Sequence, residues 1–157
     1  MSEVVYAEEL SPTDQRVTRD RWLGIMAAIA VAWYSFSLLV IVIMLSAGKA
    51  TVFSLYTPEQ LAYLAAMPFL VNVAHVVSVG AGLIGSAYLM LRRKSAYYWF
   101  AASLVCLLIM MLDASLRGGF DTMGASLMGI STVSFVIGIY LFWAAYSARN
   151  QGELNAT

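Results

Sequence analysis

The polar residues inside the apolar segments are the first candidates for chemistry. Asn72 and His75 stand three positions apart within the apolar run 69–91, a spacing that places both side chains on one side of a helix. Polar groups at that depth usually face the protein interior and can mark a solute path, a proton relay or a ligand to a quinone or haem. They can also form interhelical hydrogen bonds that fix packing, each contributing about 1 kcal/mol or less, and we favour this role.

Two further pairs could take part in binding. Trp33 and Tyr34 are adjacent within an apolar run, and Asp113 and Arg117 stand four positions apart. The Trp33 ring could stack on a sugar, but buried aromatic residues more often pack in the core and hydrogen-bond through their polar atoms. Asp113 and Arg117 fit an ion pair between positions i and i+4 of a helix. Such a pair could gate an outer cavity, although interfacial pairs usually contribute little.

Three glycines form the pattern Gly-x-Gly-x-x-Gly at Gly80, Gly82 and Gly85. In a strand–turn–helix unit this pattern holds the pyrophosphate of a dinucleotide, and an acidic residue about 20 positions on holds the ribose. The first acidic residue after Gly85 is Asp113, and the run stays apolar as far as Leu91. We therefore interpret the pattern as a chance match within a membrane helix.

Other chemistry-bearing residues are few. The chain has one cysteine, Cys106, and one histidine, so neither an internal disulfide nor a bis-His haem site can form. Its methionines could bind copper(I), but flexible filling of a core is their commoner role. With no catalytic triad and no paired intramembrane carboxylate, we expect no enzymatic activity, no metal and no cofactor.

The composition places these residues in a membrane protein. Of 157 residues, 61% are hydrophobic and 11% are charged, whereas a soluble domain is about half apolar and a quarter charged. Crossing the hydrocarbon core as a helix takes about 20 apolar residues, and four runs qualify: 22–47, 69–91, 96–116 and 123–145. The sequence predicts an all-α bundle of four transmembrane helices, preceded by a polar segment, 1–21, and followed by a tail, 146–157.

The basic residues predict the orientation of the bundle. Lys and Arg concentrate in cytoplasmic loops. One side of the four-helix arrangement carries only Lys49 and Arg117, and the other carries Arg16, Arg19, Arg21, Arg92, Arg93, Lys94 and Arg149. This bias predicts that both termini are cytoplasmic. Nine basic residues balance nine acidic ones, and without a basic face we expect no nucleic-acid partner.

The connections have their own signals. Residues 92–95 predict a tight turn, and residues 113–122 predict a small outer loop. Within the long connection 48–68, Thr57, Pro58 and Gln60 have the types and spacing of a helix start with a capping box. We expect a short helix on the outer membrane surface. It could form a lid over an outward-facing cavity, but we favour a linker that covers the end of the bundle.

Small residues recur at helical spacing in the second and fourth runs. Such residues let two helix backbones approach closely, which drives association in lipid. In the second run the small residues on the side of Asn72 and His75 are Ser78, Gly82, Gly85 and Ser86. Gly80 points to the opposite side of the helix. In the fourth run they are Gly124, Ser131, Ser134 and Gly138. The two seams predict that these helices pack closely, within one chain or between chains.

The segment from Tyr56 to Ala102 resembles a family of small, often uncharacterised four-helix proteins of the bacterial inner membrane. The likeness rests on five features. They are a Trp-Tyr pair in the first helix (Trp33-Tyr34), a TPEQ motif (Thr57–Gln60), a Met-Pro pair (Met67-Pro68), a glycine-rich second helix (Gly80–Gly85) and a basic turn (Arg92–Ala96). Some members carry the label "sugar transporter". The resemblance implies the same fold and a bacterial inner-membrane location.

Two functions fit these patterns. The first is an accessory or structural protein that acts by helix packing, either as a subunit of a larger membrane complex or as a homo-oligomer. The second is a transporter of a small solute, for example a sugar, that works as a dimer. Transporters often show inverted repeats or broken helices, and we find neither a convincing repeat nor a broken first or third helix. We therefore favour the accessory role.

Overall fold

The computed structural model describes residues 12–46, 56–152 and 154, with side chains for 21–43, 56–124, 129–152 and 154. Within these ranges the chain is helical and forms no strand, so the predicted all-α class is confirmed. Its elements are α1 (Pro12–Ser46), α3 (Pro58–Ala65), α4 (Phe69–Met90), α5 (Ala96–Leu116) and α6 (Gly119–Asn150). Lys49, most of the polar segment 1–21 and the end of the tail lie outside the described residues.

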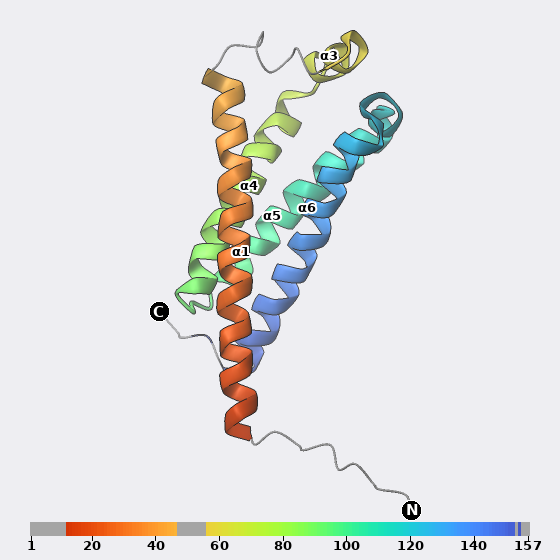
Figure 1. Cartoon of the computed structure of the whole chain (residues 1–157). Coiled ribbons are helices and arrows are strands. Elements are labelled where there is room, and N and C mark those ends of the chain that lie inside the picture. The colour runs from red at the N-terminus through yellow and green to blue at the C-terminus, as the bar shows by residue number, and fades with distance from the viewer. Residues whose placement is uncertain (1–11, 47–55, 153, 155–157) are drawn as a thin grey trace, which may run out of the picture.

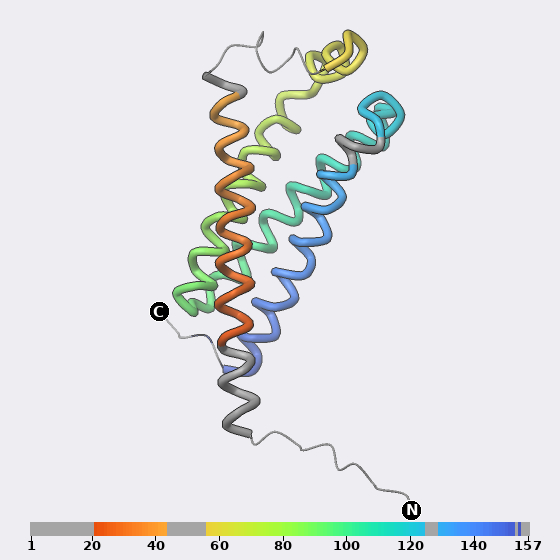
Figure 2. The backbone as a smooth tube through the Cα atoms, in the orientation of Figure 1, coloured from red at the N-terminus to blue at the C-terminus, as the bar shows by residue number. Residues whose placement is uncertain are grey.

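Four of these helices are long and apolar enough to cross a membrane. The qualifying stretches are Arg21–Ile43, Phe69–Met90, Ala96–Leu116 and Gly129–Asn150. The predicted runs therefore do form long apolar helices, as expected of a multi-pass membrane protein. Each of these stretches runs along the bundle, and the beginning of the stretch Arg21–Ile43 and the end of α6 lie at the same end of it (Figure 2).

Two helix ends differ from the sequence prediction. α1 begins at Pro12 rather than at residue 22, and proline suits the first position of a helix because its missing N–H has no partner there. α6 continues past residue 145 to Asn150, and the left-handed backbone of Gly152 follows it with φ 72°. Apolar composition located the membrane-crossing part of each helix but not its polar extension.

The turns between the long helices are tight. The predicted turn at 92–95 is confirmed, since α4 ends at Met90, α5 begins at Ala96 and the two helices share the largest contact in the described chain. The predicted loop at 113–122 is shorter in the structure. α5 ends at Leu116, as the run 96–116 predicted, but α6 starts at Gly119 rather than at residue 123, because Gly118 adopts φ 66° and reverses the chain at once.

Neighbouring helices in the bundle are mostly neighbours in the sequence (Figure 1). α4 packs on α1 and α5, and α5 packs on α6. α1 and α6 approach each other near one end and separate toward the end where α3 lies (Figure 1). The core sits where the long helices converge, and its fully buried residues include Ala27, Phe100, Leu141 and Ala145.

Candidate functional site

The small residues of α4 lie inside the chain's own bundle. Ser78, Gly82, Gly85 and Ser86 are all buried, and Gly80 has open space around it. A methyl group added at Gly82 would collide with the ring of Tyr34 on α1, and one added at Gly85 would lie 3.1 Å from the ring of Phe100 on α5. The seam therefore lets two different helices approach α4.

Hydrogen bonds of serine hydroxyls reinforce this seam. The Ser103 hydroxyl of α5 donates to the backbone oxygen of Ser78 at 2.8 Å, and the Ser86 hydroxyl donates to that of Gly82 at 2.7 Å. The buried Tyr34 hydroxyl faces Ser103 without reaching hydrogen-bond geometry. Tyr34 thus lies in the core, as the packing interpretation predicts. Ser103 escaped the sequence reasoning because a lone serine in an apolar run carries no spacing signal.

The small residues of α6 do not form one packing surface. Gly138 lies against α5, where an added methyl group would come 3.0 Å from Leu104 Cδ2. The Ser134 hydroxyl donates to Ile130 within its own helix, and Ser131 is half-buried. Gly124 interrupts α6 with φ 76° and ψ 162°, a backbone conformation almost confined to glycine. Its place in a packing seam was therefore a wrong prediction.

In the part of the chain that the structure describes, α4 and α6 do not pack along each other. Each instead contacts α5, through Gly85 on one side and Gly138 on the other. The predicted close packing of the second and fourth helices is therefore wrong within one chain. Small residues allow close approach but do not name the partner, and here the tight turns bring α5 against both helices.

Asn72 and His75 lie outside the core. Both residues are exposed, and so is Val76. The Asn72 amide reaches only the carbonyls of Met67 and Pro68 at the start of its own helix, at 3.5 Å. The expectation that the two side chains face the interior of this chain is wrong. By the spacing i, i+3 and i+4, the three residues form one exposed stripe on α4.

Asp113 and Arg117 form the predicted ion pair and do more besides. Arg117 Nε donates to Asp113 Oδ2 at 2.9 Å, and Arg117 Nη1 donates to the backbone oxygen of Ala66 at 3.1 Å. The guanidinium lies 4.4 Å from the ring centre of Tyr63 on α3. Arg117 therefore connects the end of α5 to α3, a role that the sequence spacing alone did not indicate.

The predicted capping box of α3 is confirmed. The backbone N–H of Gln60 donates to Thr57 Oγ1, and the backbone N–H of Thr57 donates to Gln60 Oε1. Gln60 also donates through its side chain to the backbone oxygen of Met123 at 3.2 Å. α3 is thus tied to the ends of α5 and α6, consistent with a linker that covers the end of the bundle.

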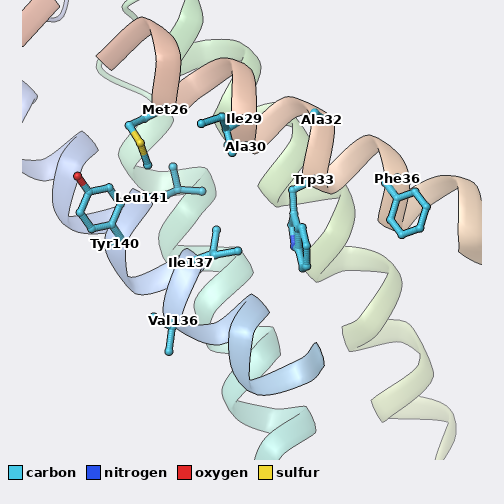
Figure 3. A pocket seen from close by; sticks show the side chains of 10 residues that line it. All are labelled: Met26, Ile29, Ala30, Ala32, Trp33, Phe36, Val136, Ile137, Tyr140 and Leu141. Carbon is cyan, nitrogen blue, oxygen red and sulfur yellow. The ribbon is translucent and has the colours of Figure 1, made fainter. Parts of the chain in front are cut away.

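Between α1 and α6 lies an apolar groove with a volume of about 580 Å³. We call it the α1–α6 groove, and ten residues line it: Met26, Ile29, Ala30, Ala32, Trp33, Phe36, Val136, Ile137, Tyr140 and Leu141. Trp33 and Ile137 point into the space between the helices (Figure 3). Sequence reasoning missed the groove, although Met26, Ile29, Ala30 and Trp33 follow the spacing i, i+3, i+4, i+7 of a helical stripe.

The described residues offer little to a metal ion. Among them, no three His, Cys, Asp or Glu side chains come close enough to hold one. Cys106 is a free, half-buried cysteine on α5. What this part of the chain does contain is a tightly packed polar seam, an exposed polar stripe and an apolar groove.

Comparison with known proteins adds no relative. No family model matches the chain, and neither a curated protein nor a solved structure is found to match it.

Proposed function

We propose that this chain is a non-enzymatic integral protein of the bacterial inner membrane that acts through helix packing. It serves as an accessory or structural subunit of a larger membrane complex, or it assembles as a homo-oligomer. The resemblance of the segment Tyr56–Ala102 to small inner-membrane proteins supports the location. The physical support comes from the outside of α4.

The exposed polar stripe on α4 carries the proposal. Asn72 and His75 lie within the membrane-crossing stretch Phe69–Met90, yet both residues are exposed instead of being packed against the other helices of the chain. Polar side chains in membrane helices almost always face protein or a water-filled cavity, because lipid cannot hydrogen-bond them. A helix of a second protein chain, with a hydrogen-bonding group opposite His75, would supply the missing contact.

The transporter alternative has weaker support. At the centre of the bundle, the Ser103 hydroxyl donates a hydrogen bond to the backbone oxygen of Ser78, and the Ser86 hydroxyl donates one to the backbone oxygen of Gly82. Bonds of this kind hold helices together and occupy both serine donors. The α1–α6 groove is apolar and therefore unsuited to a sugar. A small-solute transporter that works as a dimer stays the second candidate.

Native mass spectrometry after gentle extraction from the native membrane tests the proposal. We expect the chain to appear together with other subunits or with further copies of itself. The variant His75→Leu should weaken the association by about three- to eighteenfold and raise the fraction of monomer, because interhelical hydrogen bonds in membranes contribute about 0.6 kcal/mol and up to about 1.7 kcal/mol each. Val77→Leu, which changes an exposed residue on the other side of α4, should leave the assembly intact.

Two outcomes would contradict the proposal. One is a wild-type chain that is always monomeric under gentle extraction. The other is an assembly that His75→Leu and Val77→Leu affect equally, since the stripe would then have no part in it. A retained polar small molecule would favour the transporter instead.

We further propose that both termini are cytoplasmic. The basic turn at Arg92, Arg93 and Lys94 lies between α4 and α5, at the same end of the bundle as Arg149. Arg149 lies over the rings of Tyr97 and Tyr98, 5.2 and 5.4 Å from their centres. Basic and aromatic residues gathered at one end fit the cytoplasmic interface of a membrane. On this orientation α3 covers the outer end.

A further inference from the structure

The α1–α6 groove is an open side of the bundle. α1 packs along α4 but touches α6 only slightly, so the two helices leave a space whose walls are almost wholly apolar. The groove lies within the membrane-crossing parts of both helices, Arg21–Ile43 and Gly129–Asn150. In a bilayer it opens toward lipid rather than water.

The size and the walls of the groove favour an occupant thinner than a helix. The groove has a volume of about 580 Å³. Volumes of about 300–1,000 Å³ are typical of small-molecule sites. The walls also present large side chains such as Trp33 and Phe36, whereas close helix packing needs small ones.

The length of the groove matches one leaflet. From Met26 to Phe36 the α1 wall rises through ten residue steps, or about 15 Å at about 1.5 Å per step. Half of the hydrocarbon core of a bilayer is also about 15 Å thick. An extended hydrocarbon chain that enters at one end would therefore reach the bilayer centre near the other.

One end of the groove is polar and the other is not. Trp22 Nε1 donates to the hydroxyl of Tyr140 at 3.2 Å, beside the exposed Arg21. This bond uses the Tyr140 oxygen as an acceptor, so the hydroxyl proton can still be donated to an ester or phosphate oxygen. Trp and Tyr in such positions mark the level of lipid headgroups. The far end, at Phe36, is apolar.

From these observations we propose that the α1–α6 groove binds one acyl chain of a membrane phospholipid. The headgroup lies at the Trp22–Tyr140 end, and the chain extends along Trp33 toward Phe36. The inference does not rest on the proposed function, because the groove and the polar stripe of α4 involve different residues. Loss of one leaves the other testable.

Photo-crosslinking of lipid tests the site directly. The full chain is placed in vesicles that contain a phosphatidylcholine with a diazirine in one acyl chain, and adducts are located by mass spectrometry of peptides. We expect adducts concentrated within 26–36 and 136–141. A diazirine near the headgroup should label close to Trp22, and one near the chain end should label close to Phe36.

Matched variants separate the groove from lipid contact in general. Ile137→Trp fills the groove and should reduce its labelling about tenfold, a modest change in affinity. Ile139→Trp adds the same bulk at an exposed position outside the groove and should leave the labelling unchanged. Trp33→Ala enlarges the groove and should keep or increase it, which guards against loss of folding in the filled variant.

Equal labelling of the Ile137→Trp and Ile139→Trp variants would overturn the proposal, because the adducts would then reflect ordinary lipid at the protein surface. Labelling without dependence on diazirine position would overturn the assigned direction of the chain and with it the site. Labelling of the membrane-crossing helices that spares 26–36 and 136–141 would also overturn the proposal, because lipid would then be absent from the groove.

Discussion

Gly82 lets the ring of Tyr34 lie directly against the backbone of α4. Its neighbour two positions earlier, Gly80, meets nothing within 4 Å of where a methyl group would stand. The same residue type thus has different consequences at two positions of one helix. The difference could be predicted from the sequence, because helical geometry places Gly80 nearly opposite Gly82. That the ring against Gly82 belongs to Tyr34 could not be predicted.

Gly82→Ala should destabilise the protein by about 1–3 kcal/mol, because the added methyl group overpacks the contact with Tyr34. Gly80→Ala should be neutral or stabilising, since alanine favours the helix over glycine by up to about 1 kcal/mol. Unfolding in graded mixtures of mild and denaturing detergent measures both. Equal losses in the two variants would show that the seam does not depend on close approach at Gly82.

His75 shows where residue-level prediction failed. Its angular position on α4 falls between those of Gly82 and Ser86, which are buried, yet His75 is exposed. The buried face of α4 is narrow around Val71 and Ala74 and widens only where both α1 and α5 contact the helix. A helical wheel assumes that the same neighbouring helix covers one face along the whole length of the helix. No residue type in the sequence indicates where a neighbouring helix diverges.

At the level of elements, α3 combines a local and a distant source of order. Its capping box could be predicted because Thr57 and Gln60 are three positions apart. Its attachment could not, because Arg117 and Met123 lie more than fifty positions away in the sequence. A helix of eight residues is too short to be stable alone in water, so its order depends on the attachment.

Arg117→Lys should loosen α3 without removing charge. Lysine keeps a cation near Asp113 but loses the planar group that stacks on Tyr63 and reaches Ala66 at the same time. Backbone amides of α3 should exchange hydrogen about fivefold faster, equivalent to about 1 kcal/mol. Arg93→Lys, which changes a guanidinium 5.8 Å from the ring centre of Tyr88 at the other end of the bundle, is the control. Unchanged exchange in α3 after Arg117→Lys would mean that Arg117 does not hold it.

For the whole molecule, composition predicted how many helices are long and apolar enough to cross a membrane, and nearly where they lie in the sequence. The neighbours of each helix were harder to predict. The small residues of α4 and α6 indicated close packing correctly at Gly82, Gly85 and Gly138 but suggested the wrong partner. The α1–α6 groove was missed because it results from the divergence of two helices, which depends on crossing angles rather than on either sequence stripe.

The orientation of the molecule can be measured with single cysteines in a Cys106→Ala background. Lys94→Cys lies in the basic turn and Glu59→Cys lies on the exposed side of α3. A membrane-impermeant maleimide should label Lys94→Cys only in inside-out vesicles and Glu59→Cys only in spheroplasts, because basic loops stay in the cytoplasm. The reverse pattern would place both termini outside.

The order of contacts in the bundle has a consequence for its biogenesis. α4 and α5 are joined by a turn of five residues, 91–95, and α5 and α6 by Arg117 and Gly118. Each of these hairpins closes only a short loop, which costs little entropy and favours rapid pairing. As the chain is synthesised from its N-terminus, each new helix can thus pack against a helix that is already in the membrane. Assembly of the bundle does not have to wait for the last helix to be synthesised.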